Sequence, residues 1–114
     1  MEMPELVRKC AEKELFSYCE TKVPPCFRNE VRVNFRIEGE TATLYEERIT
    51  LANPANWSWR PVAQFRFQIE LNQWSLHYPV DRDSWRLYLN AGPTLNLKSL
   101  LRAVDDDPFN SFWQ

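Results

Sequence analysis

The side chains best placed for chemistry lie in the segment Tyr45-Glu46-Glu47-Arg48. Successive side chains of a β-strand point to opposite faces, so a Glu-x-Arg spacing puts Glu46 and Arg48 on the same face. The two groups could form a structural ion pair or line a small site, and we favour the ion pair because structural networks often produce such groups. A likeness to nucleases that carry Glu-x-Lys on a strand is weak, since arginine neither acts as a base nor binds a metal ion.

A second group of polar residues surrounds the turn between two later strands. Asp81, Asp83 and His77, together with Glu46, could hold a divalent metal ion. Aspartates at such a spacing more often bond to their own turn backbone, and His77 alternates with apolar neighbours, so we expect it to face away from the core. We therefore predict no metal site and no cofactor. The alternative function is a metal- or arginine-assisted hydrolase or nuclease that uses Glu46, Arg48 and Asp81.

Nucleophilic catalysis has little support in the sequence. The single histidine has no recognisable nucleophile–base motif, and the three cysteines, Cys10, Cys19 and Cys26, have no C-x-x-C spacing. Cys10 and Cys19 fall on opposite sides of a helix, so they cannot chelate one ion together. We predict free thiols, with Cys26 the most exposed because it follows a proline in a loop.

Aromatic side chains are the other unusual feature, with five tryptophans, four tyrosines and seven phenylalanines. Trp57 and Trp59 lie beside Arg60 at an expected loop or sheet edge, and Trp113 belongs to an aromatic segment near the C-terminus. Such a segment must dock on its own sheet, on a second subunit or on a partner. We predict a non-enzymatic protein-interaction module, with these four residues as its binding surface and an unknown protein or a second copy as its partner.

Charge argues against a nucleic-acid ligand. The chain has 14 basic and 16 acidic residues, a net charge of −2, and no basic run. Phosphate neutralisation supplies most of the affinity of nucleic-acid binders, so a local positive excess is expected of them. Stacking of single strands on exposed rings beside Arg60, Arg66 and Arg86 stays a further alternative.

These residues are positioned by a helix and a hairpin. Apolar residues recur at helical spacing over 5–22, and Pro24-Pro25 ends that helix. Strands over 30–38 and 41–50 flank Gly39-Glu40, a two-residue turn with glycine first. The turn places Phe35 opposite Leu44 and Val33 opposite Glu46, and it likewise pairs Ile37 with Ala42, Arg32 with Glu47 and Val31 with Arg48. Glu46 and Arg48 therefore fall on an otherwise apolar face.

Three more strands and a second helix follow. Residues 53–56 form a turn, and the third strand begins at Pro61 or lies at an edge, because proline cannot donate a ladder hydrogen bond. Trp74, Leu76 and Tyr78 belong to the fourth strand, and Trp85, Leu87 and Leu89 to the fifth. Asn96 caps the last helix, and an acidic run at 105–107 ends it. The apolar stripe of this helix consists of Leu97, Leu100, Leu101 and Val104. Arg102 or an arginine of a partner would compensate that acidic run.

Length and connectivity then fix the fold class. At 114 residues we expect one α+β domain over 1–114, a two-layer arrangement with a five-stranded antiparallel meander and both helices on one face. The longest stretches without charged side chains are too short to cross a bilayer, and the acidic start is unlike a signal peptide. We expect a cytoplasmic protein with no membrane partner.

Short motifs along nearly the whole chain carry a resemblance to a known family. They are Pro24-Pro25, Arg36-Ile37-Glu38-Gly39, Tyr45-Glu46-Glu47-Arg48, Pro61-Val62-Ala63, Trp74, Trp85 with Tyr88, and Val104-Asp105-Asp106-Asp107 before the aromatic end. In their order and spacing the chain resembles a family of small bacterial proteins known only as a domain of unknown function. The resemblance implies a shared fold and a bacterial origin, and it implies no activity.

Overall fold

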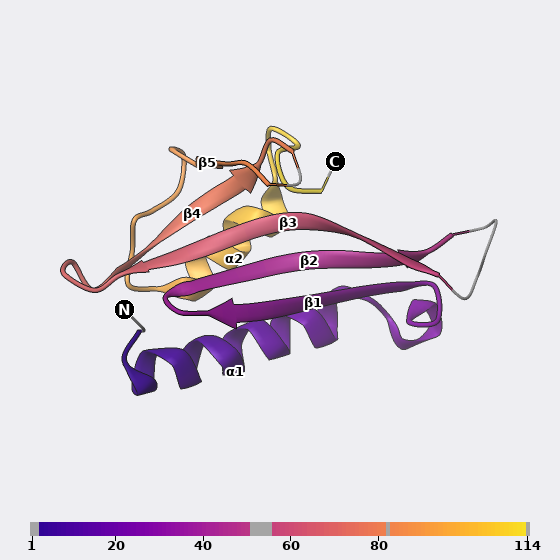
Figure 1. The fold of residues 1–114 in the computed structure, drawn as a ribbon, viewed down its shortest axis with the longest axis horizontal. Coiled ribbons are helices and arrows are strands. Elements are labelled where there is room, and N and C mark those ends of the chain that lie inside the picture. Colours follow the sequence, from indigo (N-terminus) through magenta and orange to yellow (C-terminus); the bar gives the residue numbers. More distant parts are fainter. Residues whose placement is uncertain (1–2, 51–55, 82, 114) are drawn as a thin grey trace.

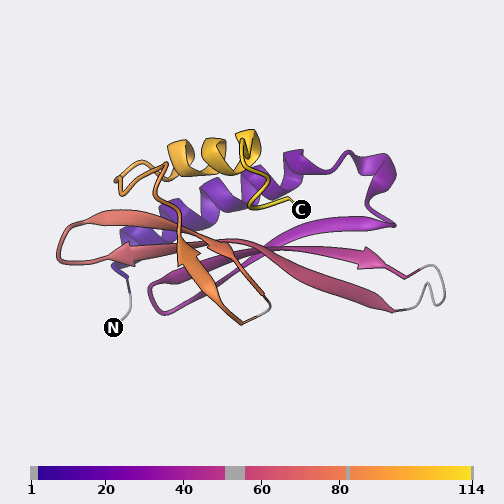
Figure 2. The ribbon, with the colours of Figure 1, turned by 90° about the horizontal axis from the view of Figure 1, so that it is seen from above.

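The chain forms one antiparallel sheet with two helices on the same side of it (Figures 1 and 2). The computed structural model describes residues 3–50, 56–81 and 83–113, so most of the turn predicted at 53–56 lies outside the described residues. The elements are α1 (Glu5–Lys22), the 3-10 turn η1 (Pro25–Phe27), β1 (Val31–Glu38), β2 (Thr41–Ile49), β3 (Trp57–Gln68), β4 (Gln73–Pro79), β5 (Trp85–Leu87) and α2 (Leu97–Asp106). The strands lie in chain order, β1-β2-β3-β4-β5. The predicted α+β meander is therefore confirmed.

The β1–β2 hairpin has the predicted register. Phe35 pairs with Leu44, Val33 with Glu46 and Val31 with Arg48. Gly39 has a φ of 60°, a left-handed conformation that glycine adopts without a steric penalty. Side chains therefore alternate between an inner face, which the helices cover, and an outer face without helices.

The third strand differs from the prediction. β3 begins at Trp57 and runs through the middle of the sheet, with β2 on one side and β4 on the other. Pro61 lies within it, opposite Tyr45, where the β2–β3 register shifts. The shift leaves Val62 as an extra residue, and such a bulge tolerates the missing N–H of proline. Trp57 and Trp59 consequently lie on a central strand rather than in a loop or at an edge.

The fifth strand is shorter than predicted. β5 ends at Leu87, and Leu89 is 82% exposed, so its assignment to the strand is wrong. Tyr88 is the buried residue here, and its ring packs against Phe112 with the ring centroids 5.0 Å apart. Leu87 pairs with His77 on the outer face, so alternation directs Tyr88 to the inner side, and the strand ends before Leu89.

The core fills the space between the sheet and the helices. Asn96 caps α2 as predicted, its side chain accepting a hydrogen bond from the Lys98 backbone N–H. The fully or nearly buried core residues include Ala11, Leu15, Val33, Leu44, Phe65, Phe67, Trp74, Leu76, Leu97, Leu100, Leu101, Val104 and Phe112. In the described part of the chain, neither helix is long and apolar enough to cross a membrane.

The acidic end of α2 is neutralised differently from the prediction. Asp105 accepts hydrogen bonds from the Tyr18 hydroxyl at 2.6 Å and from Lys22 Nζ at 2.9 Å. Both partners belong to α1, so the basic residue of this chain that pairs with Asp105 is Lys22 rather than Arg102. The contact connects the C-terminal ends of the two helices. Sequence patterns did not predict it, because the residues are far apart in the chain.

Candidate functional site

The predicted ion pair is a three-residue cluster on the inner face. Glu46 Oε1 accepts from Arg48 Nε at 2.7 Å and from Arg60 Nε at 3.2 Å. The Glu46 side chain is buried, whereas that of Arg48 is 61% exposed. Arg60 also donates from Nη1 to the backbone oxygen of Phe112 at 3.3 Å. The cluster therefore connects the middle of the sheet to the C-terminal segment.

Electrostatics favour the ionised form of Glu46. Burial alone would raise the pKa of its carboxyl group, but the hydrogen bonds and charges of Arg48 and Arg60 outweigh this and lower the pKa below its ordinary value. A general acid at neutral pH needs the opposite shift. The geometry is that of a structural ion pair.

Asp81, the third residue of the predicted hydrolase site, has a local role. Its Oδ1 accepts from the backbone N–H groups of Asp83 at 2.9 Å and Ser84 at 2.8 Å. These bonds, chiefly that from Asp83, lower the pKa of the Asp81 carboxyl. Among the residues that the structure describes, no group of three or more histidine, cysteine or acidic side chains is placed to hold a metal ion.

His77 faces the outer side of the sheet, away from the core, yet it is only 7% exposed. Its Nε2 lies 2.9 Å from Ser75 Oγ, and Ser75 donates to the backbone oxygen of Arg66. The hydroxyl therefore accepts from Nε2–H, which leaves Nδ1 unprotonated and, within the described structure, buried without a hydrogen-bond partner. Desolvation first, and the charge of Arg66 second, lower the pKa of His77 to about 4.

This serine–histidine pair was missed at the level of sequence. Its signal is Ser-x-His on a strand, the same spacing that brings Glu46 and Arg48 together. Both Ser75 and His77 are buried, and the serine hydrogen is already directed at a carbonyl. Among the described residues no group orients Nδ1, whereas an activated nucleophile requires such a group on its base.

The four predicted binding residues divide between the two faces. Trp57 and Trp59 lie on the outer face, where the Trp57 ring packs under the guanidinium of Arg32 at 3.9 Å and Trp59 packs edge-on against Tyr45 at 6.3 Å. Arg60 and Trp113 lie on the helix-covered side, and Lys22 Nζ sits 4.6 Å from the centre of the Trp113 ring. The structure therefore does not bring the four residues together.

The aromatic C-terminal segment docks on its own domain through Asp107. This residue caps α2 in a left-handed conformation with a φ of 36°. Its carboxylate accepts backbone N–H groups from Ser111 at 2.6 Å, Phe112 at 3.2 Å and Trp113 at 2.9 Å. Phe112 is thereby held in the core, and no pattern in the sequence distinguished Asp107 from its acidic neighbours.

A groove of about 470 Å³ crosses the outer face. The residues that line it come from four strands and the β4–β5 turn; they are Arg36, Thr43, Tyr45, Glu47, Trp59, Pro61, Gln64, Asp83 and Trp85. Figure 2 shows the β4–β5 hairpin curling away from the helices, and Asp83 and Trp85 of this hairpin line the groove. Of the four predicted binding residues, Trp59 is the one that lines it. The bulge at Pro61 and the bend of β5, which sequence did not reveal, create this site.

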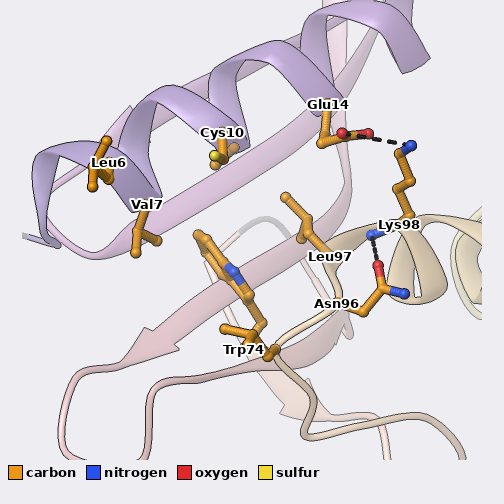
Figure 3. A pocket seen from close by; sticks show the side chains of 10 residues that line it. Leu6, Val7, Cys10, Glu14, Trp74, Asn96, Leu97 and Lys98 are labelled. Atoms are coloured by element: carbon orange, nitrogen blue, oxygen red, sulfur yellow. Dashed lines mark hydrogen bonds and ion pairs between the residues drawn. The ribbon is translucent and has the colours of Figure 1, made fainter.

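A second hollow, of about 350 Å³, lies between the two helices (Figure 3). Its walls are largely apolar, with Leu6, Val7 and Cys10 of α1 facing Trp74 and Leu97. The ion pair between Glu14 and Lys98, 3.8 Å long, closes one end. This hollow continues the packing between α1 and α2, whereas the outer groove lies on a face with no helix.

Comparison with known proteins places the chain in a family. Residues 3–114 match the family described as a domain of unknown function, DUF3024. No curated protein and no solved structure gives a significant match. The chain belongs to the DUF3024 family.

Proposed function

We propose that this domain is a non-enzymatic protein-interaction module whose outer groove binds an extended segment of a partner protein. The observation that carries the proposal is the gathering of Tyr45, Trp59 and Trp85 around Pro61 on the face opposite the core. Aromatic side chains in a concave site are typical of interface hot spots.

The groove combines aromatic rings with polar side chains. Trp59 is 44% exposed, and its edge-on contact with Tyr45 holds both rings in place before a ligand arrives. Thr43 and Gln64 line the floor, joined by a hydrogen bond of 3.2 Å. A preformed surface of this kind, with fixed aromatic and polar side chains, binds peptides at a low entropic cost.

Charge selects the kind of ligand. One cation, Arg36, and two carboxylates, Glu47 and Asp83, line the groove. An excess of negative charge disfavours nucleic-acid phosphates, which require cations. It favours an extended segment with proline or basic side chains, because aromatic grooves bind proline-rich segments and rings attract cations.

The compartment we propose is the cytoplasm. All three cysteines are free, with Cys10 and Cys26 exposed. Exposed unpaired thiols support a reducing environment, where disulfides are rare.

Selection of peptides from a random phage-displayed library would test the groove. Peptides selected on the wild-type protein should lose at least about tenfold in affinity on Trp59→Ala and Trp85→Ala, measured by calorimetry. Phe109→Ala is the matched control, because it removes an exposed ring outside the groove. Peptides that bind Trp59→Ala and Trp85→Ala as tightly as the wild type, or a library that yields none, would refute the proposal.

A further inference from the structure

A second surface, separate from the groove, lies along the free edge of the sheet. In the described structure β1 is paired on one side only, with β2. An unpaired edge strand presents a row of backbone donors and acceptors to any extended chain. β1 is eight residues long, which is ample for strand addition.

The hydrogen bonds of the hairpin show which groups are free to receive a strand. The Ile49 N–H donates to the Glu30 oxygen at 3.1 Å, so this pair is hydrogen-bonded. Antiparallel ladders alternate, and the even-numbered residues of β1 therefore bond to β2. The N–H and C=O groups of Val31, Val33, Phe35 and Ile37 consequently point toward the open edge.

Helix α1 forms the other wall of a channel beside this edge. Figure 1 shows α1 running alongside β1, and Figure 2 shows it on the inner side of the sheet. Two hollows, of about 180 and 750 Å³, lie between α1 and β1, and both are lined by Phe16 and Phe35. Phe16 is 61% exposed although it belongs to a helix whose other face is in the core. The channel has apolar places for side chains next to unpaired backbone groups.

The charges around the channel are mostly positive. Its lining contains five cations, Arg8, Lys9, Lys13, Arg28 and Arg32, and two carboxylates, Glu12 and Glu20. Arg8 pairs with Glu12 at 3.0 Å, Arg28 with Glu20 at 3.2 Å and Lys9 with Glu5 at 3.4 Å, so Lys13 and Arg32 are the cations of the lining that have no ion pair among the described residues. A local positive excess on a chain of net charge −2 favours an acidic ligand.

We propose that one extended, acidic segment of a partner protein adds to the free edge of β1 as a sixth strand and lies along the channel between β1 and α1. Its backbone pairs with the outward groups of Val33, Phe35 and Ile37. Alternate apolar side chains enter the hollows beside Phe16 and Phe35, and the intervening acidic ones lie on the outer face, where Arg32 is the cation they meet. This mode of recognition takes affinity from main-chain bonds and specificity from alternate side chains.

A second copy of the domain fits this edge poorly. A two-fold pairing of β1 with itself would bring a second α1 to the same side of the joined sheet. Because α1 already lies alongside the edge (Figure 1), the two helices would compete for one space, whereas packed helices need about 8–10 Å between axes. A single strand without its own helix meets no such conflict.

The test uses a synthetic peptide of the length of β1 that alternates glutamate with valine and phenylalanine, and a partner peptide with lysine in place of glutamate. We expect binding of the acidic peptide by fluorescence anisotropy, and at least about tenfold weaker binding of the lysine peptide. Hydrogen exchange should slow at the amides of Val33, Phe35 and Ile37, which face the edge. The amides of Arg32 and Asn34, already paired with β2, should change little.

Backbone methylation of the peptide provides a control that leaves the protein unaltered. In the added strand, every second peptide N–H points toward β1 and the others point away from it. Methylation of the first set should abolish binding, and methylation of the second set should be tolerated. Phe16→Ala should weaken binding about tenfold, whereas Leu6→Ala, an exposed residue of the same helix, should not. Trp85→Ala should also leave it unchanged, so failure here is distinct from failure of the groove proposal.

Three results would overturn the inference: no binding of the acidic peptide at millimolar concentration, equal loss from both methylation patterns, or a dimer in light scattering whose edge amides are already protected. The last result would assign the edge to a second copy of the chain instead.

Discussion

Glu46 and Arg60 lie directly opposite each other in the β2–β3 ladder, and their side chains meet on the face that the helices cover. Arg60 extends the contact to the backbone oxygen of Phe112. A carboxylate on an apolar face is costly unless it is paired, and here two guanidinium groups share one of its oxygens. The cluster thus holds the sheet and the C-terminal segment together.

Glu46→Gln should destabilise the domain by about 2–3 kcal/mol, because it removes the charge that balances Arg60 in a partly buried place. Arg48→Ala should cost no more than about 1 kcal/mol, since its side chain is largely exposed. Urea denaturation of both variants measures the difference. An equal loss in the free energy of unfolding for the two variants would mean that the burial of Glu46 does not determine how much the ion pairs stabilise the domain.

Acidification should destabilise the folded protein, because the imidazole of His77 is held neutral there by a lowered pKa. Its pKa is about 4 in the folded protein and near 6.5 when unfolded, so the unfolded state binds more protons between these values. Stability is therefore retained above pH 6.5 and falls as the pH drops from 6.5 toward 4, by about 1–3 kcal/mol.

His77→Gln isolates this contribution, because glutamine can donate to Ser75 Oγ and does not titrate. Its stability should vary less than that of the wild type between pH 6.5 and 4. Below that window both proteins should lose stability together, since the lowered pKa of Glu46 makes its stabilisation disappear when the carboxyl protonates. If the free energies of unfolding of the wild type and of His77→Gln fall in parallel between pH 6.5 and 4, the pKa of His77 is not lowered in the folded protein.

Local patterns predicted the helices and the first hairpin because each was determined by residues close in sequence. The Gly39 turn fixed the β1–β2 register, and that register placed Glu46 on the inner face. Pro61 misled the prediction of β3, since a bulge removes the penalty that proline carries in a central strand. The bulge depends on the neighbouring strand, which local sequence does not contain.

The candidate sites were harder to predict for the same reason. Trp57, Trp59 and Arg60 are neighbours in the chain, yet alternation sends Arg60 to the opposite face from the two tryptophans. The groove needs Trp85 from β5 to stand beside Trp59 from β3, and that depends on how the β4–β5 hairpin bends. Asp107 likewise acts on residues beyond its own helix.

Removal of the Asp107 carboxylate should release the C-terminal segment. Asp107→Gly keeps the left-handed backbone without strain but leaves three backbone N–H groups without their acceptor, at an expected cost of about 2 kcal/mol. Chymotrypsin should then cut after Phe109 or Phe112 faster than in the wild type. Asp106→Ala, at an exposed neighbouring position, is the control; similar cleavage rates in both variants would contradict the assigned role.

The three thiols should react at very different rates, which tests the helix arrangement around α1. Cys10 and Cys26 are exposed, whereas Cys19 is half-buried and desolvation raises the pKa of its thiol to about 12. Because the thiolate is the reactive form, Cys19 has almost none available at neutral pH. Maleimide labelling followed by mass spectrometry should therefore show rapid modification of Cys10 and Cys26, and modification of Cys19 only after urea unfolds the domain. Labelling of Cys19 in the native protein at the rate of Cys26 would mean that α1 separates readily from the sheet, and the channel proposed beside β1 would then have no stable wall.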